Sequence, residues 1–157
     1  MKNIPAEISK LQYSALSKLL LESISKLMNT DFKNHQDFDT LHEQQCNQLI
    51  QAFDAAYKKY QMHLYIGQAQ KWINMSIKYL FALGESRHSF QIKNLEYFHI
   101  PIDNLIQIEL HKNGIEPLNT KWSRIEDYSE YLNYQIQVRN LQPKRIPLEL
   151  EFELFKS

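Results

Sequence analysis

The chain has little of the residues that break or cross-link a fold. Its 157 residues include three glycines, five prolines, one cysteine and a single valine. Scarce glycine and proline favour long regular elements with few tight turns. One valine beside many Leu, Gln, Lys and Glu residues favours helices over strands. We therefore expect an all-α fold in which residues 1–157 form a single-domain bundle of five to seven helices that contains a helical hairpin.

The sequence also lacks an excess of charge, a second cysteine and a long apolar run. The formal net charge is zero, which counts against a protein that holds nucleic acid mainly through its phosphates. Cys46 has no partner for an intrachain disulfide, as is usual in the reducing cytoplasm. No apolar run approaches the roughly 20 residues that span a bilayer, and the N-terminus is too polar for a signal peptide. We expect a cytoplasmic protein without a membrane partner.

Hydrophobic periodicity places the helices along the chain. Capping-box patterns at Thr40 and Ser123 indicate two of the helix starts. The segment from Glu85 to His99 is irregular in pattern, with room for one short helix around residues 92–98. The expected helices run from Pro5 to about Met28, Leu41 to about Tyr60, Gln68 to Leu83, Pro101 to about Leu110, and Arg124 to about Leu141.

The last residues fit two structures. Apolar residues alternate with glutamates over residues 148–154, which is typical of an edge strand. Pro147 and Glu149, however, suit the first turn of a helix, and the chain offers no obvious partner strand. We favour a short helix.

The stretch 60–84 has the clearest pattern of the chain. One face of its helix repeats apolar residues at helical spacing, and the opposite face, with Lys71, Asn74 and Lys78, is expected to meet solvent. Residues 55–84 carry four lysines and no acid, a balance of +4 in a neutral chain. The expected inner face is Ala69, Trp72, Ile73, Ser76, Ile77, Leu80 and Leu83.

Motifs for metals and cofactors are missing from the sequence. None of the six histidines pairs with another at i, i+4, and there is no HExxH. There is also no GxxxxGK[ST], no GxGxxG and no GxSxG. We expect no metal site and no cofactor.

Lys71 and Asp103 are the residues that fit a chemical role. Lys71 lies near the start of a predicted helix, where free amides and the positive end of the dipole suit a phosphate. The same field disfavours an ammonium ion, and a neutral lysine is the form that Schiff-base chemistry requires. Asp103 follows Ile100-Pro101-Ile102 and either caps the next helix or stabilises positive charge developing on a sugar.

Two motifs carry a resemblance to a known family. They are GQAQKWINM at residues 67–75 and HIPID at residues 99–103. Together they resemble the helix-hairpin-helix DNA glycosylase superfamily, most closely its archaeal 8-oxoguanine glycosylase type. The resemblance implies that Lys71 is the nucleophile that forms a Schiff base and that Asp103 assists departure of the base. It also implies that Gly67 and Gln68 contact DNA phosphate, with Lys78 adding positive charge, although the family hairpin usually has two glycines where this chain has only Gly67.

Three hypotheses for function follow. The first is a glycosylase or lyase that acts on damaged DNA through Lys71 and Asp103. The second is a helix-hairpin-helix protein that binds DNA without catalysis. The third is a helical protein-interaction module with a protein partner or a second copy of itself, as in bacterial defence or toxin–antitoxin systems; neutral charge and abundant aromatic residues favour this one.

Overall fold

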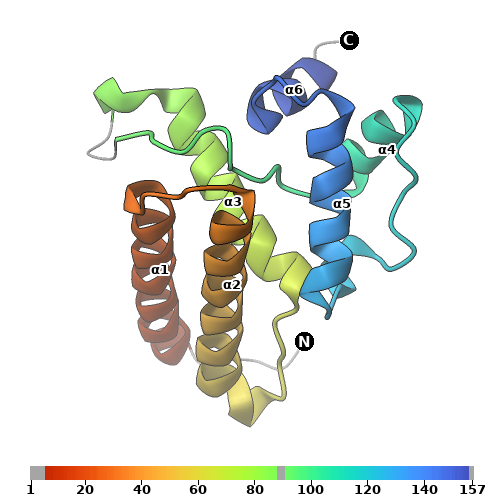
Figure 1. Ribbon diagram of the computed structural model, residues 1–157. Coiled ribbons are helices and arrows are strands. Elements are labelled where there is room, and N and C mark those ends of the chain that lie inside the picture. The colour runs from red at the N-terminus through yellow and green to blue at the C-terminus, as the bar shows by residue number, and fades with distance from the viewer. Residues whose placement is uncertain (1–5, 88–90, 156–157) are drawn as a thin grey trace.

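The computed structural model describes residues 6–87 and 91–155, which form six α-helices and no strand (Figure 1). This confirms the predicted all-α fold. The predicted first residue of the first helix, Pro5, lies outside the described residues. The helices are α1 (Ala6–Asn29), α2 (His35–Tyr57), α3 (Ile66–Leu83), α4 (Asn104–Lys112), α5 (Tyr128–Leu141) and α6 (Pro147–Leu154), with short 3₁₀ turns η1 (Lys58–Tyr60), η2 (Glu85–Arg87) and η3 (Trp122–Arg124).

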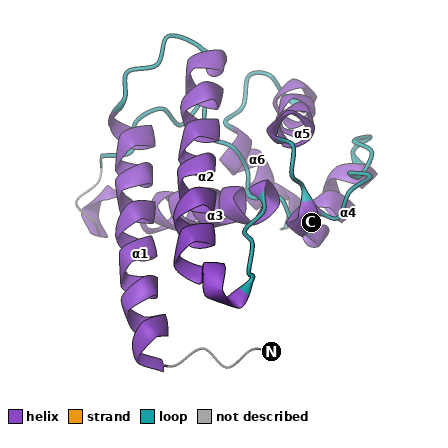
Figure 2. Cartoon of the chain, turned by 90° about the horizontal axis from the view of Figure 1, so that it is seen from below, coloured by secondary structure: helices purple, strands orange, loops and turns teal. Residues whose placement is uncertain are grey.

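The first two helices lie antiparallel, and α3 packs across both of them (Figures 1 and 2). We expected the second and third helices to lie alongside each other as the hairpin. Instead α1 and α2 form that hairpin, while α3 begins beside α5 and crosses α2 (Figure 1). The C-terminal segment is the short helix α6, as favoured, and it contacts α4.

Three predicted helix starts are wrong because other residues cap the helices. Helix α2 begins at His35, not Leu41, because the Asn34 side chain accepts a hydrogen bond from the Asp37 amide at 3.0 Å. The Thr40 hydroxyl lies inside the helix and donates to the carbonyl of Gln36 at 2.8 Å. The extra turns bury Phe38, which is 0% exposed, against the core.

The start of α5 shifts in the opposite direction. Asp127 caps it by accepting from the Ser129 amide at 2.8 Å, whereas Ser123 belongs to η3. The backbone at Ile125 is extended, with φ −61° and ψ 122°, which separates η3 from the helix. Helix α4 similarly begins after Asp103, three residues beyond the predicted Pro101.

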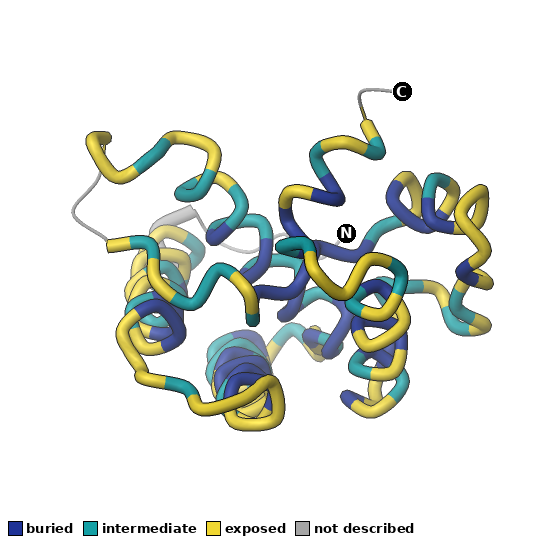
Figure 3. The backbone as a smooth tube through the Cα atoms, turned by 45° about the horizontal axis from the view of Figure 1, so that its top comes forward, coloured by how far each residue is buried: buried dark blue, intermediate teal, exposed yellow. Residues whose placement is uncertain are grey.

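A segment without regular secondary structure passes through the core. Residues 98–102 are all buried, and Figure 3 shows the buried residues concentrated in the middle of the molecule. The short helix considered at residues 92–98 is absent, and only a turn forms at residues 95–97. This segment separates α3 from α5 and leads directly to Asp103.

The faces of α3 follow the predicted pattern with two corrections. Ala69, Ile73 and Ile77 are buried, as expected. Leu83 is 54% exposed, because α3 extends beyond the helices it packs against. Asn74, predicted to meet solvent, is 0% exposed, because the core segment and α5 cover that side of the helix.

Candidate functional site

Two glutamines bind the backbone of the buried segment 98–102. The Gln135 side chain accepts from the Ile100 amide at 3.2 Å and donates to the Ile100 carbonyl at 2.8 Å. The Gln70 side chain does the same for Ile102, at 3.4 Å and 3.2 Å. A buried extended backbone needs partners for its polar groups, and each side-chain amide takes the place of a neighbouring strand. Because Gln70 holds Ile102, the next residue, Asp103, is placed beside α3.

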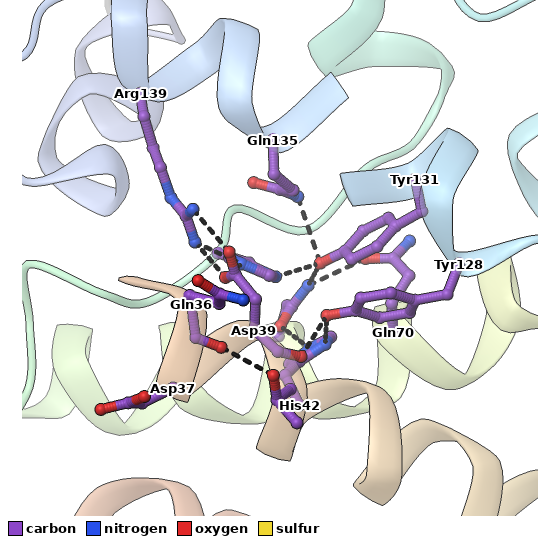
Figure 4. Close-up of polar contacts among 12 residues, drawn as sticks. Gln36, Asp37, Asp39, His42, Gln70, Tyr128, Tyr131, Gln135 and Arg139 are labelled. Carbon is purple, nitrogen blue, oxygen red and sulfur yellow. Dashed lines mark hydrogen bonds and ion pairs between the residues drawn. The ribbon is translucent and has the colours of Figure 1, made fainter. Parts of the chain in front are cut away.

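A closed ring of hydrogen bonds lies behind these glutamines. Figure 4 shows Tyr128 and Tyr131 of α5 pointing toward His42 and Asp39 of α2, with Arg139 reaching Asp39 from another side. The ring passes from the Asp39 carboxylate to His99 (2.8 Å), Tyr131 (2.7 Å), Asn74 (2.8 Å), His42 (3.0 Å), Tyr128 (2.8 Å) and back to the Asp39 carbonyl oxygen (3.1 Å).

The hydrogen-bond donors assign the protons on one side of the ring. Asn74 and Gln135 both donate to the Tyr131 oxygen, so the phenol proton is directed at His99 Nδ1. Neutral His99 then donates from Nε2 to the Asp39 carboxylate. Burial is the main reason that the pKa of His99 falls to about 4, although the hydrogen bond to Asp39 opposes this shift.

Asp39 remains ionised within this ring. Burial by itself raises the pKa of Asp39, but hydrogen bonds from Arg139 and His99 outweigh burial and hold the pKa well below its ordinary value. Arg139 donates to both carboxylate oxygens, at 2.9 Å and 2.5 Å. Since Tyr131 is 0% exposed, its hydroxyl presents nothing to a substrate, and the ring fixes the packing of α2, α3 and α5.

The two residues predicted to act together do meet. Lys71 Nζ lies 2.5 Å from Asp103 Oδ2, with the side chains 21% and 29% exposed. The other carboxylate oxygen caps α4 by accepting from the Ile106 amide at 2.9 Å. The Lys71 ammonium also lies 5.8 Å from the centre of the Trp122 ring, which favours a cation.

The ion pair keeps Asp103 charged. Burial acts to raise the pKa of Asp103, but the hydrogen bonds from Lys71 and the Ile106 amide lower it below its ordinary value. The pair therefore presents an ammonium ion at the surface, and Lys71 must lose a proton before it can attack as a nucleophile.

The residues predicted to contact DNA are engaged within the protein. The Gly67 amide, expected to be free, donates to the Ile125 carbonyl at 3.2 Å. The Gln68 side chain accepts from the Tyr65 amide at 3.1 Å and caps α3. Lys78 pairs with Glu151 at 2.7 Å, and these side chains are 17% and 2% exposed. None of the three extends freely from the surface, and their contact with DNA stays a prediction.

Lys71 also lines an apolar groove of about 480 Å³ between α1, α2 and α3. The walls are one stripe of α1 and one stripe of α3, and α2 contributes two aromatic rings. Lys71 is the charged residue among the lining side chains. The α1 stripe is Tyr13, Leu16, Ser17 and Leu20; the α3 stripe is Trp72, Met75, Ser76 and Tyr79; α2 adds Phe53 and Tyr57.

Sequence reasoning missed the polar residues that organise this region. Gln70, Asn74 and Gln135 resemble ordinary surface residues of amphipathic helices. Their partners in other elements lie 26 to 57 residues away in the chain, so local spacing contains no sign of them. The apolar spacing of α3 assigns Asn74 to the opposite face, so no local sign marked it.

Comparisons with known proteins add no relative. No protein-family model matches the chain, and neither curated proteins nor solved structures provide a match. Within the described ranges, no helix combines the length and apolar character needed to cross a bilayer. The same residues contain no group of three or more His, Cys, Asp or Glu side chains placed to hold a metal ion.

Proposed function

We propose that this protein is a helical interaction module whose groove between α1, α2 and α3 receives an amphipathic helix of a partner protein. The observation that carries the proposal is the construction of the groove. Each wall presents side chains at i, i+3, i+4 and i+7, the spacing of one helix face. Two such stripes with aromatic rings between them are typical of sites that bind an apolar helix face.

Charge and exposure specify the partner helix further. Tyr13 and Tyr79, at opposite walls, are 72% and 59% exposed, which leaves apolar surface for a partner to cover. Exposed Lys18 follows Ser17 on α1 and no acidic residue lines the groove, whereas Lys71 is already paired with Asp103. The complementary occupant is a helix with an apolar face and an acidic residue at its edge.

Photo-crosslinking in cells that produce the protein tests this proposal. A photoreactive phenylalanine analogue replaces Tyr79 in the groove or, as a control, Ile108, which is 54% exposed on α4 outside it. We expect crosslinks from position 79 to an amphipathic helix with an acidic residue. Purified partner should then bind the Met75→Glu variant at least tenfold more weakly than the unaltered protein. Equal crosslinking from both positions, or crosslinks only to a second copy, would contradict the proposal.

The contact between Lys71 and Asp103 supports a second candidate, a DNA glycosylase or lyase. In this reaction the neutral Lys71 amine attacks the sugar aldehyde of an abasic site, and an imine forms with loss of water. The Asp103 carboxylate, 2.5 Å from the amine, suits stabilisation of the positive charge that develops on the sugar.

Borohydride reduction tests this second candidate directly. The reductant converts the imine into a stable secondary amine, so protein and DNA become covalently joined. We expect an adduct from the unaltered protein and from Lys58→Ala, an exposed lysine, but none from Lys71→Ala. If no adduct forms at all, the lyase is ruled out. Salt-sensitive DNA binding without an adduct indicates the non-catalytic DNA-binding hypothesis instead.

A further inference from the structure

A second pocket, of about 570 Å³, lies between α4 and the loop at residues 117–122. It is separate from the helix groove described above. Its lining includes His111, Lys112 and Lys121 and no acidic side chain. Lys112 is paired with Glu109 at 2.8 Å, so the charge available to a ligand comes from Lys121.

The walls of this pocket are held in place by buried polar contacts. The Gln107 side chain, on α4, accepts from the Leu118 amide at 3.0 Å and donates to the Asp103 carbonyl at 3.1 Å. The first bond attaches the loop to α4, and the second holds the Gln107 side chain against the residue that caps the same helix. The pocket is therefore largely preformed, which reduces the ordering that binding requires.

Several polar side chains at the pocket have no use within the fold. The side chains of Asn104, Asn119, Thr120 and Lys121 line it and make no hydrogen bond or ion pair with another described residue. Amides, a hydroxyl and an amine at the rim of a preformed pocket are the groups that orient a polar ligand.

Trp122 supplies an aromatic surface on a segment whose backbone packs closely against the start of α3. It is half-buried, and its backbone lies so close to Gly67 that a Cβ on residue 67 would sit 1.6 Å from the Trp122 carbonyl oxygen. The Gly67 amide also donates to Ile125, three residues further on. A half-buried indole at the wall of a pocket is a platform on which a planar base can stack.

From these features we propose that the pocket binds a nucleoside phosphate. The base stacks on Trp122, the side-chain amides of Asn104 and Asn119 contact its edge, and Lys121 contacts the phosphate. The pocket volume lies in the range of small-molecule sites. The nucleotide is either a free mononucleotide or the terminal nucleotide of a single strand, since both present the same groups.

Calorimetric titration of the full chain with AMP, GMP, CMP and UMP at low salt tests the proposal. We expect saturable binding that weakens about tenfold in Trp122→Leu. Because that variant removes core contacts, Lys121→Gln and Asn119→Ala provide exposed substitutions that leave the fold unchanged. Each should weaken binding at least threefold. Lys59→Gln, which replaces an exposed lysine of η1 outside the pocket, should have no effect on binding.

Further titrations separate the sources of the nucleotide. Single-stranded oligonucleotides that bind more tightly than the mononucleotides identify a strand end as the ligand, and the reverse identifies a free nucleotide. Inorganic phosphate should compete poorly, because the base supplies the stacking. The proposal is overturned if no nucleotide binds at millimolar concentration, if phosphate competes equally well, or if Lys121→Gln behaves like Lys59→Gln. The Met75→Glu variant should bind nucleotides normally, since it alters only the groove.

Discussion

Acidification should destabilise this protein through its two buried histidines, His42 and His99. Their side chains are 0% and 1% exposed, so a proton taken up by either imidazole places a positive charge in the core. Burial is the first cause of both shifts: it lowers the pKa of His99 from 6.5 to about 4 and that of His42 well below 6.5.

The sign of the effect follows from where the proton binds. Between pH 6.5 and the lowered pKa, the unfolded chain binds a proton that the folded protein does not, so the free energy of unfolding falls as the pH falls. Each pKa unit corresponds to about 1.4 kcal/mol, so His99 should account for about 2 kcal/mol between pH 7 and pH 5. The pKa of His42 is lowered in the same direction, so His42 adds to this loss.

Asp39 does not cancel this loss. Its pKa lies below the ordinary 3.8, so it remains ionised from pH 7 to pH 5 in both states and contributes no pH dependence there. Its stabilising effect is fully present above pH 3.8 and is lost only as the pH falls further. Carboxylates and histidines thus act in different pH ranges.

Urea unfolding followed by circular dichroism at pH 7, 6 and 5 measures the predicted loss. In His99→Gln the decrease between pH 7 and pH 5 should shrink by about 2 kcal/mol, because one of the two titrating groups is gone. A free energy of unfolding that stays constant down to pH 5 would refute the reasoning. So would an unchanged pH dependence in the His99→Gln variant.

Three further predictions test the packing. Gly67→Ala should lower the free energy of unfolding by about 3 kcal/mol or more in thermal unfolding, since the added methyl group collides with backbone. Gly84→Ala should lower it by only about 1–2 kcal/mol, because the space there is open and only the φ of +76° is unfavourable for alanine. Gln135→Leu should lose about 2–3 kcal/mol in urea titrations, because it leaves buried backbone groups of the core segment without their partner. Lys78→Met should lower the free energy of unfolding by about 3 kcal/mol, because it leaves Glu151 buried and unpaired. Adding Glu151→Gln to the same chain should restore much of that loss. Equal stability of the single and double variants would contradict this reasoning.

Several helix ends could not be read from the sequence, although the helices themselves could. Thr40 and Ser123 have the form of capping residues, yet Asn34 and Asp127 cap the helices instead. Each candidate offers the same kind of oxygen to a helix amide. The choice between them depends on whether the flanking turn buries apolar surface, as α2 does when it brings Phe38 into the core.

Some features of the candidate sites could be predicted from the sequence and others could not. The nearness of Lys71 and Asp103 was predicted from motif resemblance and is present, whereas the role of Gly67 was not. A glycine near a helix start resembles a turn, and only the approach of residues 122–125 requires it to lack a side chain. The pocket beside Trp122 was also beyond prediction, because its two walls come from α4 and a loop that no periodicity describes.

The sequence by itself determined the all-α class, the order of the helices and most of their apolar faces. These properties depend on neighbours three and four residues apart, and local spacing reports them directly. Only the tertiary structure decided that Gln70, Asn74 and Gln135 face inward to bind a buried extended segment. Polar side chains gain from burial only when a matching partner arrives from elsewhere in the chain, and that partner is set by packing rather than by spacing.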